Sequence, residues 1–369
     1  MCSEENKKKS NKVIKYVFSE TLLHFIDKNP AIQGRSQLVH ELIKSYKLLE
    51  KLQVIPPRIC STAELSQFHS IDYLSALKNE DELELFGLGY DCPVWEGIFD
   101  YCKIVAGSTL AACYELCKKQ SDIVINWFGG WHHAQKDKAG GYCYINDIVL
   151  GAMLLLKVYK RVLYIDLDVH HGDGVEGAFE TSNRVFCLSF HQHEPGFFPG
   201  TGNSESTGFA LGKGYSANFP YKSGIDGKQF TKYFEIVTSR VFDTFRPKAV
   251  IIQCGGDSLV GDPLGGTNMV PKDMIRCIRF VLQRNLPTCI LGGGGYNFQN
   301  TAKYWTQVIA DILNEKLEED IPDDCPCFLE FGPDYTLKMK TNSFVKDLNL
   351  EEECEKNVED IFKNLEFCK

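Results

Sequence analysis

The chain has 369 residues, and its 40 Lys and Arg against 49 Asp and Glu give a formal net charge of −9. Apolar residues make up 44% and charged residues 24%, a composition that excludes a largely disordered chain and is typical of a folded protein. The acidic balance argues against direct nucleic-acid binding, because no overall positive field neutralises phosphates.

Fifteen cysteines are spread from Cys2 to Cys368 without a CxxC pair, which predicts buried thiols in a reducing compartment. The lysines at positions 7–9 are not followed by the apolar stretch of a signal peptide. The longest apolar run, residues 148–156, is far shorter than the roughly 20 residues that span a bilayer. We therefore expect an intracellular protein with no membrane segment.

In chain order, apolar spacing predicts helices over residues 16–28 and 36–52, and a closing helix where Val358, Ile361, Phe362 and Leu365 share one face. Short β-branched runs between them predict strands at residues 123–127, 162–168, 185–191, 249–254 and 288–291. Helical segments separate several of these runs, at residues 146–160, 229–245 and 273–284. Near-continuous apolar strands alternating with helices predict an α/β fold with a parallel sheet that helices cover on both faces.

Polar residues and glycines follow all five predicted strands. The segments that follow the strands, or end them, are residues 129–133, 166–173, 189–191, 255–257 and 292–296. Open parallel sheets bind their ligands beyond the carboxyl ends of the strands. We therefore expect these segments to form one shared site.

Asp166, Asp168 and His170 alternate along the second run, so an extended strand would point all three the same way. Asp257 follows the fourth run and could supply a further ligand. Asp168, His170 and Asp257 with an open fourth position would match a catalytic zinc site, although Fe²⁺ or Mn²⁺ would also suit these ligands. The alternatives are a hydrated polar strand end and, for Asp257, a helix cap.

His132 and His133 could act as base and acid beside such a metal, if Asp166 and Asp173 bind their far nitrogens and fix the tautomers. Taken alone, two histidines after a Gly-Gly turn can equally be ordinary turn residues. Tyr296 follows four glycines and could stabilise an oxyanion. These glycines lack the spacing of a phosphate-binding loop, so nucleotide binding is not predicted.

Bulky side chains occupy two Gly-rich loops, with Phe197 and Phe198 in residues 195–200 and Tyr142 in residues 140–142. They either pack as ordinary loops or wall a narrow channel for an uncharged chain. From the residues alone, we predict a metal-assisted hydrolase with a dry channel.

The motifs at residues 129–134, 166–174, 195–202 and 292–297 resemble those of the class I zinc-dependent histone deacetylases, and residues 90–101 most resemble the eighth subtype of that family. The resemblance implies a single arginase/deacetylase-type domain over residues 14–369, with a central parallel sheet of about eight strands, after a flexible segment of residues 1–13. It also implies hydrolysis of N6-acetyl-lysine on histones and other proteins to lysine and acetate, through a metal-activated water.

Position by position, the resemblance implies Zn²⁺, or Fe²⁺ in its place, at Asp168, His170 and Asp257. It makes His133 the general base and then acid, with His132 as its electrostatic partner, and it places Tyr296 at the substrate carbonyl. The implied substrate-binding residues are Asp91, Gly141, Tyr142, Phe198 and Leu264. The implied potassium sites are Asp166, Asp168, His170, Ser189 and Phe190 for one ion, and Phe179, Ser182, Val185 and Tyr215 for another.

Three positions depart from the family pattern: Tyr142 stands where Phe is usual, Leu264 where the eighth subtype tends to carry Met, and Gln37 where it has a phosphorylatable Ser. The implied partners are acetylated histones and other chromatin proteins, with repression of transcription, a nuclear and cytoplasmic location and activity without corepressor subunits. The alternatives are a related amidohydrolase acting on longer acyl-lysines or acetylated polyamines, and a catalytically inactive chromatin scaffold. A two-metal arginase-like site is disfavoured because a third acidic residue is missing after His170.

Overall fold

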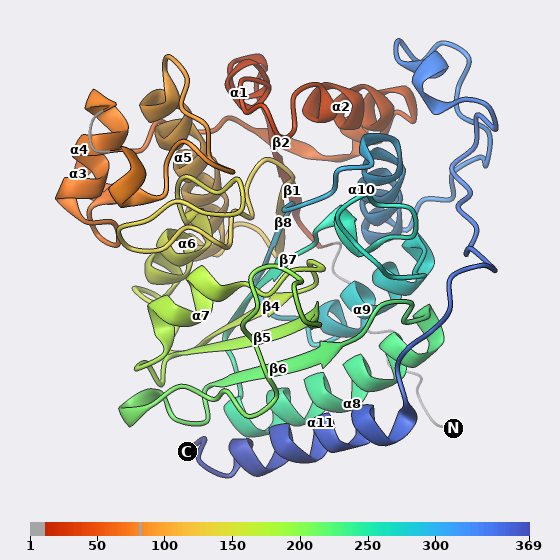
Figure 1. Cartoon of the computed structure of the whole chain (residues 1–369). Helices are drawn as coiled ribbons and strands as arrows, with labels where there is room; N and C mark the ends of the chain where they lie inside the picture. The colour runs from red at the N-terminus through yellow and green to blue at the C-terminus, as the bar shows by residue number, and fades with distance from the viewer. Residues whose placement is uncertain (1–11, 81–82) are drawn as a thin grey trace, which may run out of the picture.

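A single parallel sheet runs through the middle of the protein, and its strands follow the order β2-β1-β3-β8-β7-β4-β5-β6 (Figure 1). The structure is a computed structural model that describes residues 12–80 and 83–369. The strands are Ile14–Val17 (β1), Gln53–Ile55 (β2), Ile123–Asn126 (β3), Val162–Asp166 (β4), Val185–Gln192 (β5), Ser216–Tyr221 (β6), Ala249–Gln253 (β7) and Thr288–Leu291 (β8). Every neighbouring pair is parallel, which confirms the predicted α/β architecture and its eight strands.

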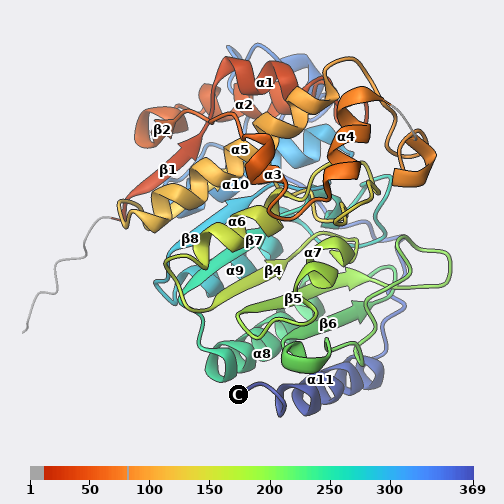
Figure 2. The same cartoon turned by 90° about the vertical axis from the view of Figure 1, so that its left-hand side faces the viewer.

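Helices cover both faces of the sheet, with α5 and α6 on one side and α8, α9 and α10 on the other (Figures 1 and 2). Within the described residues the helices are Glu20–Ile26 (α1), Arg35–Ser45 (α2), Thr62–Leu65 (α3), Ile71–Asn79 (α4), Ile98–Cys117 (α5), Asp147–Leu155 (α6), Asp173–Phe179 (α7), Gly227–Phe245 (α8), Pro271–Leu282 (α9), Phe298–Leu313 (α10) and Glu351–Leu365 (α11). No described helix is long and apolar enough to cross a bilayer.

The central strands are apolar along their whole length because helices bury both of their faces. Every residue of β3, β4, β7 and β8 is buried. The covering helices show the complementary pattern: in α9, Met274, Cys277, Ile278 and Val281 form a buried stripe at helical spacing. Because the strands themselves are apolar, polar side chains lie beyond their carboxyl ends.

The predicted closing helix is confirmed as α11, which packs on α8 and on the edge strand β6. Asn357 Nδ2 donates to the Pro220 carbonyl of β6 over 2.8 Å, so the helix is also hydrogen-bonded to this edge. At the other end of the chain, most of the predicted flexible segment lies outside the described residues. Val13 is described, and its backbone N–H donates to Asp122.

Several predicted boundaries are wrong. The helix predicted over residues 16–28 begins only at Glu20, because residues 14–17 form β1 and Ser19 caps the helix. The helix predicted over residues 36–52 ends at Ser45 and is followed by a 3₁₀ turn, Leu48–Lys51. The second predicted strand ends at Asp166, two residues earlier than expected.

Candidate active site

Four neighbouring strands deliver the predicted site residues to one place. His132 and His133 follow β3, Asp168 and His170 follow β4, Asp257 follows β7, and Tyr296 follows β8. Because β3, β8, β7 and β4 are adjacent in the sheet, the segments beyond their carboxyl ends meet although they are far apart in sequence.

The side chains of Asp168, His170 and Asp257 form a buried group whose ligand atoms all lie within 4.8 Å of one another. His170 Nδ1 lies 3.2 Å from Asp168 Oδ1 and 3.3 Å from Asp257 Oδ2. Among the residues that the structure describes, none donates a hydrogen bond to the buried Asp257 Oδ2. Burial together with the charge of Asp168 raises the pKa of Asp257 to about 8. A divalent cation fits this donor set, because it would neutralise the two carboxylates and complete the coordination of that oxygen.

The predicted alternation along one strand is not what brings these ligands together. Since β4 ends at Asp166, Asp168 and His170 lie in a bend. The backbone N–H of Asp168 donates to Asp166 Oδ1 and that of His170 donates to Asp168 Oδ1, each over 3.1 Å. These turn-like hydrogen bonds, rather than the pleat of a strand, orient the two ligands.

The four glycines before Tyr296 let the chain run against the carboxylates. The Gly294 N–H donates to Asp168 Oδ2 over 2.9 Å, and a Cβ atom at Gly294 would collide with the Asp257 carboxylate. Gly293 has φ +135°, and a side chain there would collide with the Gln253 amide. The glycine run therefore leaves room for the metal-ligand group.

The two histidines bind different carboxylates through their Nδ1 atoms: His132 lies 2.8 Å from Asp166, and His133 lies 2.7 Å from Asp173. Burial favours the neutral form of His132, but the charges of Asp166 and Asp168 outweigh it and raise the pKa to about 9. For His133, burial and then the charge of His132 lower the pKa to about 4. At neutral pH the pair therefore holds a protonated and an unprotonated imidazole side by side.

Tyr296 is held at its backbone rather than by its hydroxyl group. Asp262 Oδ2 accepts from the N–H groups of Tyr296 and Asn297, over 2.7 and 2.9 Å. Burial raises the pKa of Tyr296 well above its usual value, so the phenol keeps its proton. A protonated phenol is a hydrogen-bond donor, as an oxyanion-stabilising group must be.

Aromatic rings flank the histidines and the tyrosine. The Phe198 ring lies 4.9 Å from that of His133, and the Tyr142 ring lies 5.6 Å from that of Tyr296. Gly141 has φ +54°, and a Cβ atom there would collide with His133. Phe198 is 44% exposed and its ring also contacts His133, so apolar surface extends from the protein surface to the predicted catalytic residues.

The predicted rim residues occupy different surroundings. Asp91 is exposed and accepts a 2.5 Å hydrogen bond from the Gly141 N–H, so it also braces the loop beside the histidines. Leu264 is 37% exposed, and its N–H donates to Asp262, the residue that binds the Tyr296 backbone. Asp91 therefore connects to the loop beside the histidines, and Leu264 connects through Asp262 to the segment that carries Tyr296.

Comparison with known proteins decides the family, because the histone deacetylase domain matches residues 29–312. The chain belongs to the histone deacetylase family. It is 42% identical to histone deacetylase 8 of Danio rerio over 371 residues, which cover 98% of this chain and 97% of the relative. Histone deacetylase 8 of Xenopus tropicalis is 44% identical, with 88% and 90% covered, and histone deacetylase 1 of Homo sapiens is 40% identical, with 91% and 71% covered.

These matches confirm the resemblance to class I histone deacetylases, and to the eighth subtype in particular. They also confirm that the protein is a histone deacetylase and therefore a hydrolase. Of the alternatives considered from the sequence, they do not favour an amidohydrolase of another substrate class. The family implies a divalent metal, usually Zn²⁺, and the buried group at Asp168, His170 and Asp257 is suited to one.

The two sets of residues that would bind potassium in this histone deacetylase lie at opposite ends of β5. In the first set, Ser189 stands opposite Asp166 in the sheet, and its Oγ lies 2.8 Å from His191 Nδ1. The second set is found where α7 ends and β5 begins, with the Ser182 N–H donating to the Phe179 carbonyl over 2.8 Å. Val185 and Tyr215 lie near the same end. Potassium binding stays a prediction.

Sequence reasoning missed several residues that position the deacetylase site. Gln253 Nε2 donates to Asp168 Oδ2 over 2.6 Å, and the Tyr164 hydroxyl donates to Asp166 Oδ2 over 2.7 Å. Asp147 accepts from the N–H groups of Gly130 and Trp131 and so fixes the turn before His132. Gln253 and Asp147 could have been noticed in the sequence because each is a polar residue within an otherwise apolar segment. A buried polar group needs a hydrogen-bond partner.

Proposed function

We propose that this histone deacetylase hydrolyses N6-acetyl-lysine to lysine and acetate, with Zn²⁺ held by Asp168, His170 and Asp257. The observation that carries the proposal is the buried ligand group beside two histidines with opposite pKa shifts. When bound there, zinc supplies a Lewis acid that polarises the acetyl carbonyl and lowers the pKa of a water molecule. Fe²⁺ is the alternative metal that the same donor set would accept.

His133 is the general base, because its lowered pKa leaves it unprotonated at neutral pH and Asp173 fixes its tautomer. With Nδ1–H directed at Asp173, the lone pair of His133 is on Nε2. There His133 takes up a proton from the attacking water and then passes it to the leaving lysine amine. Protonated His132 supplies positive charge next to this step. The Tyr296 phenol donates to the oxygen of the acetyl carbonyl as that oxygen gains negative charge.

The substrate side chain lies between Tyr142 and Phe198, whose rings suit an uncharged acetyl-lysine better than a free lysine. Asp91 at the rim accepts backbone N–H groups of the substrate in addition to that of Gly141. Acetylated histones and other chromatin proteins are the proposed substrates. We further propose activity without corepressor subunits, potassium at the two predicted sites, a role in transcriptional repression, and nuclear and cytoplasmic pools.

The test is turnover of an acetyl-lysine peptide by the purified chain, with and without a hydroxamate chelator. We expect hydroxamate-sensitive release of acetate, and we expect His133→Ala to abolish it while the zinc content stays equal to that of the parent. His24→Ala is the matched control, because His24 is exposed on α1. Substantial turnover by a zinc-loaded His133→Ala variant would contradict the base role, and no turnover by the zinc-loaded parent would contradict the proposed activity.

A further inference from the structure

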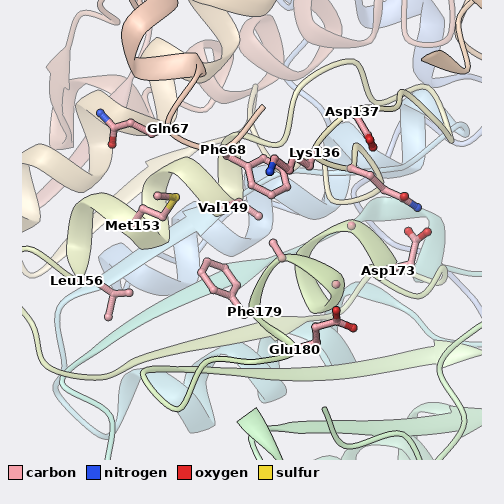
Figure 3. A pocket seen from close by; sticks show the side chains of 14 residues that line it. Gln67, Phe68, Lys136, Asp137, Val149, Met153, Leu156, Asp173, Phe179 and Glu180 are labelled. Atoms are coloured by element: carbon pink, nitrogen blue, oxygen red, sulfur yellow. The ribbon is translucent and has the colours of Figure 1, made fainter. Parts of the chain in front are cut away.

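A cavity of about 710 Å³ lies between α6, α7 and the segments that carry Phe68 and Asp137 (Figure 3). This volume falls within the range of sites that bind small organic molecules. Asp173 lines the cavity and also binds His133, so one wall of the cavity belongs to the catalytic machinery. The proposed hydrolysis leaves the rest of this cavity without a role.

One end of the cavity is apolar. Val149, Met153 and Leu156 line it from α6 and the turn that follows, and Phe179 lines it from α7. Met153 and Leu156 remain partly exposed, so an apolar ligand body that covered them would remove hydrophobic surface from water. Figure 3 shows Met153 and Leu156 at the far end from Asp137 and Asp173.

The other end is negatively charged. Three carboxylates, those of Asp137, Asp173 and Glu180, face the cavity together with a single ammonium group, that of Lys136. Within the described residues, Asp137, Glu180 and Lys136 have no ion-pair partner within 4.0 Å. The hydrogen bond from His133 holds the pKa of Asp173 below its usual value despite burial, so this carboxylate is a fixed negative charge. A cavity with an apolar end and an anionic end is complementary to an apolar cation.

We propose that the cavity binds an organic ammonium ion with an apolar body, whose charged group binds Asp173 from the cavity side. Asp173 uses Oδ1 for His133 and keeps 19% of its side chain exposed, so part of the carboxylate stays accessible to a ligand. The ammonium ion competes with His133 for this carboxylate. If His133 is the general base, as proposed above, the ligand lowers kcat without blocking the binding of acetyl-lysine.

Binding is tested directly by NMR on the zinc-loaded protein with ¹³C-methyl-labelled methionine, which gives five signals at most. The probe is 4-phenylbutylamine, and 4-phenylbutan-1-ol is its uncharged control. We expect the amine to shift the Met153 signal, also when a hydroxamate fills the active site, and the alcohol to shift it far less. No shift at millimolar amine, an equal shift with the alcohol, or loss of the shift with hydroxamate would each overturn the proposal. None of these outcomes depends on turnover.

Variants locate the site and its link to catalysis. Asp137→Asn and Glu180→Gln should each weaken amine binding by about 1.5- to 5-fold, as expected for exposed charges, while Asp72→Asn on α4 should leave it unchanged. Met153→Trp should fill the cavity and abolish binding with basal kcat unchanged. In the parent, the amine should lower kcat at constant KM for the peptide. A rise in KM alone, or equal inhibition of Met153→Trp, would show that the amine acts elsewhere and overturn the link to Asp173.

Discussion

His132 and His133 are consecutive in the chain, and their Nε2 atoms lie 2.9 Å apart. In the resting state, only one of these two atoms carries the proton that lies between them. The opposite pKa shifts assign that proton to His132, whose pKa is raised to about 9, whereas that of His133 is lowered to about 4. The two roles are separated because each imidazole has its own carboxylate, Asp166 at the end of β4 and Asp173 at the start of α7.

The first prediction concerns the pH dependence of kcat/KM. Because the pKa of His133 is lowered to about 4, the acid limb of kcat/KM should lie below pH 6.5. Asp173 stabilises the protonated form of His133, so Asp173→Asn should lower this pKa further, move the acid limb to lower pH and reduce the maximal rate. Rate profiles down to the lowest pH at which circular dichroism shows a folded protein measure both effects. An acid limb that moves to higher pH would contradict the assignment.

The second prediction concerns Tyr296, whose phenol keeps its proton in this partly buried position. Tyr296→Phe should lower kcat by about 10²–10³-fold, as the loss of an oxyanion donor typically does. KM should change little, because the ring that lines the substrate path remains. Steady-state kinetics on an acetyl-lysine peptide check this, with Tyr114→Phe on the exposed part of α5 as control. An unchanged kcat would remove Tyr296 from the reaction.

Metal binding should stabilise the fold. The proposed zinc ligands Asp168, His170 and Asp257 come together only in the folded protein. A ligand at 100 times its Kd adds about 2.7 kcal/mol to the free energy of unfolding. Chelation should therefore lower Tm and added Zn²⁺ should restore both Tm and turnover. Asp257→Asn should abolish the zinc-dependent part of Tm. A Tm that zinc raises equally in parent and variant would place the metal at another site.

Gly294 tests whether the glycine run makes room for the metal ligands. The methyl group of Gly294→Ala would collide with the Asp257 carboxylate, so we expect loss of zinc affinity and of turnover. Gly177→Ala is the matched control, because a Cβ atom there meets nothing within 4 Å. Zinc content after dialysis against a weak chelator compares the two. Full zinc occupancy in Gly294→Ala would show that the loop can move aside.

At the rim, Asp91 should affect substrate binding more than chemistry. Asp91→Ala removes both the brace to Gly141 and the acceptor offered to the substrate, so KM should rise by about tenfold, in the range of a hydrogen bond to a charged group. Asp91→Asn keeps an acceptor oxygen and should raise KM less. Asp100→Ala, on α5 away from the site, should change neither constant. A fall in kcat at constant KM would contradict this reading.

The central half of the fold could be predicted from sequence because its strands are fully buried apolar runs that are followed by glycines or polar residues. The strands at the two edges of the sheet could not be predicted. β2 has only three residues, and β6 reads Ser-Ala-Asn-Phe-Pro-Tyr, in which polar residues interrupt any continuous apolar run and a proline argues against a strand. Helix α5 was not predicted because most of its residues are buried. Its sequence therefore lacks the polar face that distinguishes an amphipathic helix.

For the site, the sequence predicts which residues take part but not how they are oriented. Asp168, His170 and Asp257 were singled out because polar residues directly follow buried strands. The bend after Asp166, which orients them, depends on backbone hydrogen bonds that the sequence pattern does not encode. Gln253 was overlooked for a related reason, since its role depends on the neighbour that the sheet places beside it.

The strand order has a consequence for how the chain becomes active. β8 lies between β3 and β7, so this late strand joins one half of the sheet, β2-β1-β3, to the other, β7-β4-β5-β6. A folding intermediate without β8 leaves the strands of the two halves unpaired with each other, and it lacks the segment that carries Tyr296. Such non-local pairing forms slowly. During refolding, recovery of turnover should therefore lag behind recovery of the helical circular dichroism signal. The rate at which activity returns then reports when β8 pairs with β3 and β7.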